Sequence, residues 1–216
     1  MQKIIALVIA GWATSASALT LNPKRTIELR GMVDESTLLL AAAVEMLAQE
    51  STDPIDIVID SPGGMVTPTH YLLNAMEAAK GRGVVFRCAV INMAMSAAFF
   101  VFANCNERYA LPWAMLMWHP ISQRIRSVNA DEAEMIATEL RQADAAFKLS
   151  AVRAMRVSGD FYDLHSVAET KWIASSLAMV TPKFMRIVST VQPGNLFQHL
   201  IPQGGTSGGS PTIRTP

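Results

Sequence analysis

Apolar and polar positions along the chain predict strands that alternate with helices. Segments such as 54–64 are short β-branched apolar runs that end in turn residues, which is typical of buried strands. Segments such as 34–51 repeat apolar residues every three or four positions, which is typical of helices, and this one starts with a candidate N-cap at Asp34 or Ser36. In chain order, we predict strands at 26–34, 54–64, 84–92, 107–112 and 114–119, and helices at 34–51, 68–83, 96–105 and 129–157, with a short helix from Ser166. The alternation predicts an α/β fold with a largely parallel sheet, right-handed crossovers and a functional site at the carboxyl ends of the strands.

The two ends of the chain depart from this pattern. Residues 1–18 combine Lys3, an apolar run and the small residues Ala16-Ser17-Ala18, which predicts a secretory signal peptide cleaved after Ala18. The apolar run is short for a bilayer span, which favours cleavage over a membrane anchor, and cleavage is also favoured over a buried N-terminal helix. Residues 201–216 are rich in Gly, Ser and Pro, which predicts a flexible tail. We therefore expect one domain at 19–200 in a periplasmic or secreted protein, with no stable membrane anchor after cleavage.

Charge and length narrow the function classes. The 216 residues suffice for one sizeable core, and 18 Lys and Arg balance 18 Asp and Glu. Because the chain has no excess of positive charge, which nucleic-acid binding would favour, we expect no nucleic-acid partner.

Three predicted strand ends carry residues that can do chemistry. The run "IDSPGG" ends on Gly63-Gly64, whose backbone N–H groups can form a nest for an anion. The run "NMAMSAAFF" places Ser96 at a strand-to-helix corner before the small Ala97, and "MLMWHP" ends a strand on His119. Each alone has a simpler explanation: a tight turn, a helix N-cap or a core histidine. Together they predict a nucleophile, a general base and an oxyanion site.

The runs "IDIVIDSPGG", "MAMSAAFFVFA" and "RYALPWAMLMWHP", in this order and followed by a long helix, resemble the proteolytic subunit of the Clp protease and its smaller Clp-fold serine peptidase relatives, in the crotonase clan. The resemblance covers roughly residues 25–182. It implies a fold of repeated ββα-like units with a long protruding helix, and a serine-type endopeptidase that uses no cofactor or metal. In that activity Ser96 would be the nucleophile and His119 the general base, and the N–H groups of Gly64 and Ala97 would form the oxyanion hole.

The resemblance leaves the acid of the triad open. The family's Asp lies a few residues before a Ser/Thr-x-x-Glu helix cap, which Ser166 and Glu169 match. In the connection before that cap, Asp160 is favoured over Asp163, because Asp163 could equally brace the cap. A third possibility is to align "ETKW" with the family's acid-Thr-aromatic stretch, which makes Glu169 the acid. That alignment is disfavoured, because it removes the helix cap and places Pro182 inside a helix.

The sequence departs from the family's pattern in two places, and its expected location affects which partners it can have. The stretch from Ser96 to Leu111-Pro112 is shorter than in the bacterial housekeeping enzyme, and "NMAMS" lacks the usual Gly. An extra-cytoplasmic location also removes ATP and the unfoldase ring, so we expect a stand-alone peptidase that acts on peptides or unfolded protein.

The long helix resembles the element that forms homo-oligomeric rings in the family, with apolar positions at Met135, Ile136, Leu140, Phe147 and Leu149. The alternatives are a non-catalytic binding or assembly protein and a crotonase-type acyl-CoA enzyme, although the latter needs no Ser-His pair and no signal peptide.

The expected fold also bears on Cys88 and Cys105. A strand from Cys88 to the serine corner covers about 17 Å, and a helix returning to Cys105 covers about 14 Å, so a disulfide is geometrically feasible. The favoured alternative is two free thiols buried as small hydrophobic groups.

Overall fold

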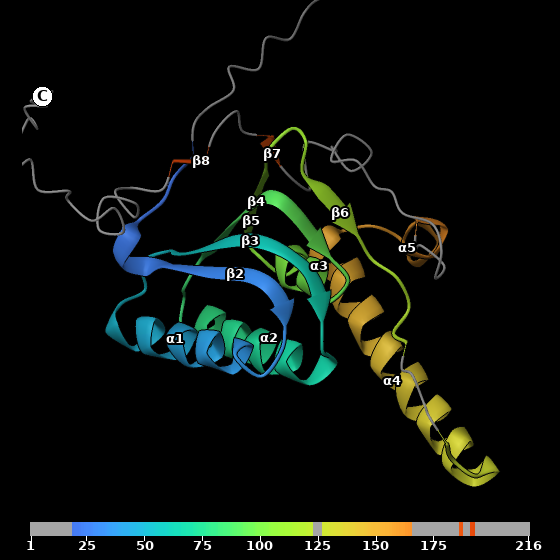
Figure 1. Ribbon diagram of the computed structural model, residues 1–216. Coiled ribbons are helices and arrows are strands. Elements are labelled where there is room, and N and C mark those ends of the chain that lie inside the picture. The colour runs from blue at the N-terminus through green and yellow to red at the C-terminus, as the bar shows by residue number, and fades with distance from the viewer. Residues whose placement is uncertain (1–18, 123–126, 166–185, 188–190, 193–216) are drawn as a thin grey trace, which may run out of the picture.

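A parallel sheet, in which helices connect most of the consecutive strands, forms the centre of the structure (Figure 1). The computed structural model describes residues 19–122, 127–165, 186–187 and 191–192. In chain order the elements are β1 (Leu19–Thr20), η1 (Pro23–Arg25), β2 (Thr26–Val33), α1 (Thr37–Glu50), β3 (Ile55–Gly64), α2 (Val66–Gly81), β4 (Phe86–Met95), α3 (Ala97–Ala103), β5 (Glu107–Ala110), β6 (Met115–Met117), α4 (Ala130–Met155), α5 (Gly159–His165), β7 (Arg186–Ile187) and β8 (Val191–Gln192). The predicted α/β class with a largely parallel sheet and a long helix is confirmed.

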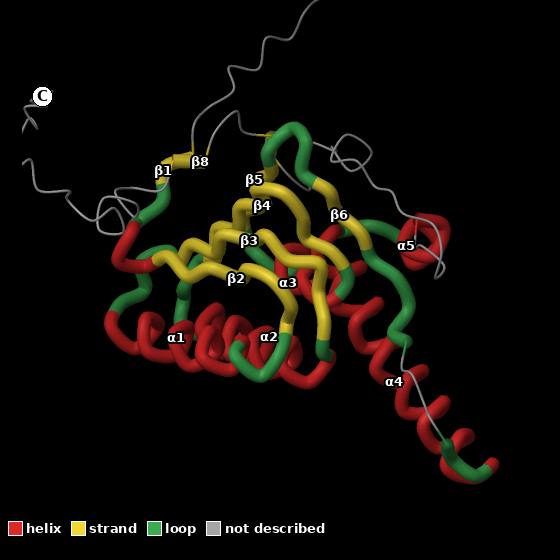
Figure 2. The backbone as a smooth tube through the Cα atoms, viewed as in Figure 1, coloured by secondary structure: helices red, strands yellow, loops and turns green. Residues whose placement is uncertain are grey.

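The main sheet runs in the order β2-β3-β4-β5-β7, and all its described pairings are parallel. Helices α1 and α2 lie along one face, and α3 lies beneath β4, as Figure 2 shows. The core between sheet and helices contains alternate residues of the strands, such as Ile57 and Ile59 of β3, which are fully buried. This alternation follows from the two-residue period of strands. The carboxyl ends of β2, β3 and β4 consequently meet at one edge of the sheet.

The opposite face of the sheet is covered by a smaller apolar cluster and an ion pair. Val58 packs there with Leu21 and Tyr109. Asp56, which is fully buried, accepts two hydrogen bonds from the Arg87 guanidinium, at 2.7 and 2.8 Å, and one from the Asn22 backbone N–H at 2.7 Å. A buried carboxylate is tolerated only when it is paired in this way.

Helix α1 begins at one of the two expected N-cap positions, but among the described residues it lacks the expected side-chain bond to the helix. Ser36 occupies the N-cap position, but its side chain makes no capping bond to α1 within the described residues. Asp34 accepts hydrogen bonds from both the N–H and the hydroxyl of Ser36, so the turn before α1 is closed by Asp34. At the other end of α1, the buried guanidinium of Arg25 donates to the carbonyl groups of Leu47, at 3.0 Å, and of Ser51 and Asp53 just beyond the helix.

Strand β4 changes neighbour along its length. Its first half, including Cys88, pairs with β5, whereas Met93–Met95 pairs with β6. The register between β3 and β4 also shifts between Ile59 and Ser61. This exchange brings the end of β6 beside the end of β4, although the two segments are joined through α3 and β5.

Helix α4 projects away from the sheet (Figure 1). It begins with a capping box in which Asn129 and Glu132 bond reciprocally, at 2.9 and 3.1 Å. Of its predicted apolar positions, Phe147 belongs to the core, whereas Met135 and Leu149 are more than half exposed. The projecting part of α4 therefore presents apolar side chains to its surroundings.

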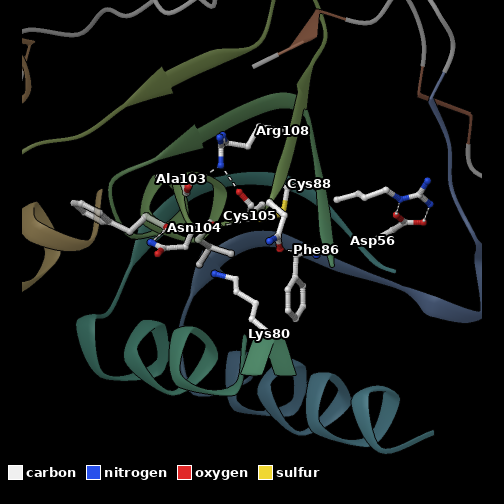
Figure 3. The surroundings of a disulfide bond; sticks show 12 residues. Asp56, Lys80, Phe86, Cys88, Ala103, Asn104, Cys105 and Arg108 are labelled. Carbon is white, nitrogen blue, oxygen red and sulfur yellow. Dashed lines mark hydrogen bonds and ion pairs between the residues drawn. A yellow bond between two sulfur atoms is a disulfide. The ribbon is translucent and has the colours of Figure 1, made fainter. Parts of the chain in front are cut away.

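Cys88 and Cys105 form a disulfide, with their Cα atoms 6.0 Å apart (Figure 3). The expectation of two free thiols is therefore wrong. Cys88 lies on β4 before the serine corner and Cys105 follows α3, so the chain turns back at Ser96 and returns to the first half of β4. The bridge closes a segment with a sequence separation of 17 residues, which has Ser96 at its middle.

Several predictions concern residues outside the described part of the chain. They are the signal peptide at 1–18, the tail at 201–216 and the helix from Ser166 with its Glu169 cap. Among the helices that the structure describes, none is both long and apolar enough to cross a membrane.

Candidate active site

The ends of β4 and β6 place Ser96 and His119 on neighbouring strands. Met95 is paired with Met117, and the Ser96 backbone N–H donates to the Met117 carbonyl at 2.8 Å. His119 comes two residues after that carbonyl. The serine corner and the histidine segment are thus held together by backbone pairing, which does not depend on either side chain.

Ser96 has an unusual backbone conformation. Its φ is 51° and its ψ is −123°, in a region that residues other than glycine rarely adopt. It occupies the N-cap position of α3, yet its hydroxyl makes no capping hydrogen bond among the described residues. The simple N-cap explanation therefore does not hold, since the hydroxyl is not used by the helix. Strain of this kind is typical of functional corners between a strand and a helix.

The glycine pair at the end of β3 allows the backbone to approach this corner. Gly63 has φ of 92°, and a Cβ atom placed on it would lie 2.5 Å from the Met95 carbonyl oxygen and 2.6 Å from the Ser96 Cβ. A Cβ on Gly64 would collide with the backbone of Val33. Both positions therefore require glycine, one against the serine and one against β2.

A cavity of about 220 Å³ lies over these residues. Gly64, Ser96, Ala97 and His119 contribute to its lining. The N–H of Ala97 belongs to the first turn of α3, where N–H groups lack an intrahelical partner. The remaining lining consists of Ser122 and of the apolar side chains Val66, Phe100, Ile121 and Phe147. Four of the five predicted site residues are thus brought to one cavity with a largely apolar wall.

His119 is half-buried and has one ring nitrogen engaged. Its Nδ1 lies 2.6 Å from the Pro120 carbonyl oxygen, and because a carbonyl only accepts, Nδ1 carries the proton in this contact. Nε2 is then the acceptor, as a general base requires. No hydrogen bond joins Ser96 to His119 among the described residues.

The segment around His119 is anchored on both sides. Trp118 stacks on Phe99 of α3, with ring centroids 4.8 Å apart, and its indole N–H donates to the Tyr162 carbonyl at 3.1 Å. On the other side, the Ile121 N–H donates to Asp144 of α4 at 3.0 Å. The sequence analysis missed these anchors, because nothing in the local pattern links Asp144 or Tyr162 to the histidine strand.

Tyr162 places a hydroxyl in the interior beside this anchor. The side chain is 3% exposed, and its hydroxyl has no hydrogen-bond partner in the part of the chain that the structure describes. Burial raises the pKa of Tyr162, and the nearby charges of Asp144 and Asp163 raise it further. The group therefore stays neutral and acts as packing for Trp118.

Two of the three candidate acids lie on a helix, where the sequence predicted a connection. Asp160 is in the first turn of α5, is exposed and is not part of the cavity lining. Asp163 pairs with Lys148 of α4 at 2.6 Å. Glu169 lies outside the described residues. The assignment of the acid to Asp160 stays a prediction, as do the roles of the other site residues.

His70 lies next to the wall of this cavity, because it stacks on Phe147, with ring centroids 4.7 Å apart. Within the described residues, no group of three or more His, Cys, Asp or Glu side chains is arranged to hold a metal ion.

The sequence profile of the Clp protease family matches residues 9–156. The chain belongs to the Clp protease family. Among curated proteins, it is similar to the ATP-dependent Clp protease proteolytic subunit 2 of Prochlorococcus marinus (strain MIT 9313), with 31% identity over 104 residues. That alignment covers 48% of this chain and 50% of the relative, so the chain spans about half the length of the curated relative that it matches. Membership of this family of peptidases indicates hydrolase chemistry.

Proposed function

We propose that this protein is a serine peptidase that hydrolyses peptide bonds through an acyl-enzyme on Ser96. The observation that carries the proposal is the hydrogen bond from Ser96 N–H to the Met117 carbonyl, because it holds a strained serine corner beside the strand that ends at His119. Family membership supports the same chemistry.

The proposed reaction uses each residue of the cavity. His119 Nε2 accepts the Ser96 hydroxyl proton as Oγ attacks the scissile carbonyl, and the N–H groups of Gly64 and Ala97 stabilise the oxyanion. The protonated imidazole then gives its proton to the leaving amine. Water attacks the acyl-enzyme by the same route, which releases the second product and restores the serine. Asp160 is proposed to orient His119, with Asp163 and Glu169 as the alternatives.

The lining of the cavity favours one class of substrate. Phe100, Phe147, Val66 and Ile121 form an apolar wall next to Ser96. A substrate side chain that enters this cavity is best stabilised when it is apolar, because it is then transferred from water into an apolar surrounding. We therefore propose peptides or unfolded segments with an apolar residue before the cleaved bond.

We further propose that the protein acts in the periplasm or outside the cell, without an ATP-driven partner. The residue pattern of 1–18 supports export, and the disulfide between Cys88 and Cys105 is of the kind that persists in oxidising compartments. A homo-oligomeric ring is proposed through α4, whose exposed Met135 and Leu149 support an intersubunit contact.

A non-catalytic binding protein of the same fold is the second candidate. Two observations favour it: Nδ1 of His119 faces the Pro120 carbonyl, and Asp160 does not line the cavity. In this alternative the cavity would bind peptide without cleaving it.

Labelling with a fluorophosphonate distinguishes the two candidates. The wild-type protein should be labelled at Ser96 and should cleave a fluorogenic peptide with an apolar residue before the reporter. Ser96→Ala should abolish both signals, whereas His119→Ala should slow labelling strongly while the fold is retained by circular dichroism. Absence of both labelling and cleavage in a folded wild-type protein that still binds the peptide would assign the non-catalytic role.

A further inference from the structure

A second cavity lies at the opposite end of α3 from Ser96. Its volume is about 540 Å³, more than twice that of the cavity at Ser96, and the two share no lining residue. Its walls come from the ends of α2, α3 and α4 and from β5. Figure 3 shows three of its residues, Lys80, Asn104 and Arg108, around the disulfide partner Cys105.

Basic side chains dominate the lining of this cavity. Lys80, Arg108, Arg153 and Arg156 contribute to it, against one acidic residue, Glu77, which gives an excess of three positive charges. The whole chain has as many acidic as basic residues, so this concentration is a local feature and does not reflect a basic protein. Charges of one sign on the walls of a concave site focus the electric field and concentrate ions of the opposite sign.

The cations are held close together at an energetic cost. Burial, together with the neighbouring charge of Arg156, lowers the pKa of the Arg108 guanidinium to about 10. Arg108 keeps its place by donating to the carbonyl groups of Ala103 and Cys105 at the end of α3. The structure thus maintains a positive group in a position that disfavours positive charge.

Arg156 reaches the cavity from a strained backbone position. It is the C-cap of α4, with φ of 56° and ψ of 42°, a left-handed conformation that is usually taken by glycine or asparagine. An arginine at this position gives up the stability that glycine would supply. What it gains is a second arginine of α4 and its C-cap in the lining of the cavity, in addition to Arg153.

The polar neutral residues of the lining are fixed by their own bonds. The Ser150 hydroxyl donates to the side-chain oxygen of Asn104 at 2.9 Å, and the Asn104 amide donates to the Phe100 carbonyl at 2.8 Å. The disulfide at Cys105 ties the same wall to β4. The cavity therefore has a preformed framework, which lowers the entropic cost of binding.

We infer that this cavity is a binding site for a small multivalent oxyanion, of phosphate or carboxylate chemistry. Guanidinium groups match the paired oxygens of both classes, and a volume of about 540 Å³ accommodates a ligand with several such groups. Arg153 and Arg156 are the principal ligands, because Lys80 pairs with Glu77 and Arg108 donates to backbone carbonyl groups. The inference is independent of the peptidase proposal, since no residue of the Ser96 cavity takes part.

Isothermal titration calorimetry of the full-length protein with pyrophosphate and with citrate, at constant ionic strength, tests this inference. We expect saturable binding of at least one of the two anions with one site per chain, and the tighter one identifies the ligand chemistry. Arg156→Gly should weaken that binding at least tenfold while it raises the melting temperature, because glycine relieves the strained position. Opposite effects on affinity and stability cannot result from unfolding.

Arg141→Gln is the matched control, since Arg141 is an exposed arginine of α4 outside the cavity. It should leave the affinity unchanged. No saturable binding of either anion, or an affinity that Arg156→Gly and Arg141→Gln change equally, would overturn the inference.

Discussion

Asp144 Oδ1 accepts a hydrogen bond from the Ile121 backbone N–H at 3.0 Å, and so connects the long helix to the strand end that carries His119. Ile121 is two residues after His119, and its own side chain lines the cavity. The bond therefore fixes the path of the chain where the proposed base leaves the sheet.

Removing this acceptor should impair catalysis more than stability. Asp144→Ala is expected to lower kcat/KM by about ten- to a hundredfold, because small errors in the position of a catalytic group carry penalties of this order. Asp144→Asn retains a side-chain oxygen that accepts the same bond, and it should keep most of the activity. The measurement is steady-state hydrolysis of a fluorogenic peptide, with melting temperatures as the fold control. Equal losses in the two variants would show that Asp144 acts through its charge.

The acid of the proposed triad can be assigned with three single variants. Asp160→Asn, Asp163→Asn and Glu169→Gln each remove one carboxylate, and the one that orients His119 should lower kcat by about 10⁴-fold. The other two should lie within a few-fold of wild type.

The Asp163 variant needs its own control, because it also breaks the ion pair with Lys148. Lys148→Gln breaks the same pair and leaves the carboxylate in place. The pair is largely exposed, so we expect a change of no more than about 1 kcal/mol in the free energy of unfolding for either variant. If Lys148→Gln reproduces an activity loss of Asp163→Asn, the loss is structural.

Gly63→Ala should destabilise the protein far more than Gly31→Ala. Both glycines have positive φ, 92° and 71°, so each substitution carries a backbone penalty of about 1–2 kcal/mol. A Cβ on Gly31 meets nothing within 4 Å, whereas on Gly63 it meets the Met95 carbonyl oxygen and the Ser96 Cβ. We expect an additional cost of about 1–3 kcal/mol for Gly63→Ala, measured by urea denaturation. Equal midpoints for the two variants would contradict the close approach of β3 to the serine corner.

The disulfide should contribute about 3 kcal/mol to the free energy of unfolding, as expected for a loop of about this length. Removal in the double variant Cys88→Ala/Cys105→Ala, or reduction with dithiothreitol, should lower the urea midpoint of unfolding. Dithiothreitol should have no effect on the double variant, which separates reduction of this bond from other actions of the reagent. A wild-type protein whose midpoint does not respond to reduction would argue against the bond.

Strands and helices that produce a periodic pattern in their own segment of the sequence could be predicted. The strand at 54–64 and the helix at 129–157 are recovered within a few residues, because buried β-branched runs and helical periodicity record burial directly. The convergence of Gly64, Ser96 and His119 on one cavity also agrees with the sequence analysis, since parallel strands end at a common edge.

Features that depend on distant partners could not be read from the pattern. The change of neighbour by β4, from β5 to β6, is a pairing between distant segments, which no local periodicity records. The two-residue strands β1 and β8 have no periodicity to detect. Helix α5 was predicted as a connection, because Gly159, Asp160 and Asp163 are typical of turns, and packing of Tyr162 against Trp118 outweighs that tendency.

The complete burial of α3 has a consequence for motion. Every residue from Ala97 to Ala103 is buried, so the amides of this helix should exchange with solvent only when the whole domain unfolds. Helix α5 has the exposed side chains Asp160 and Asp163 and contacts the core through Tyr162, so we expect it to open at a lower free energy than α3. A triad completed from α5 would therefore be assembled and dismantled by local opening alone, while the serine corner stays in place throughout.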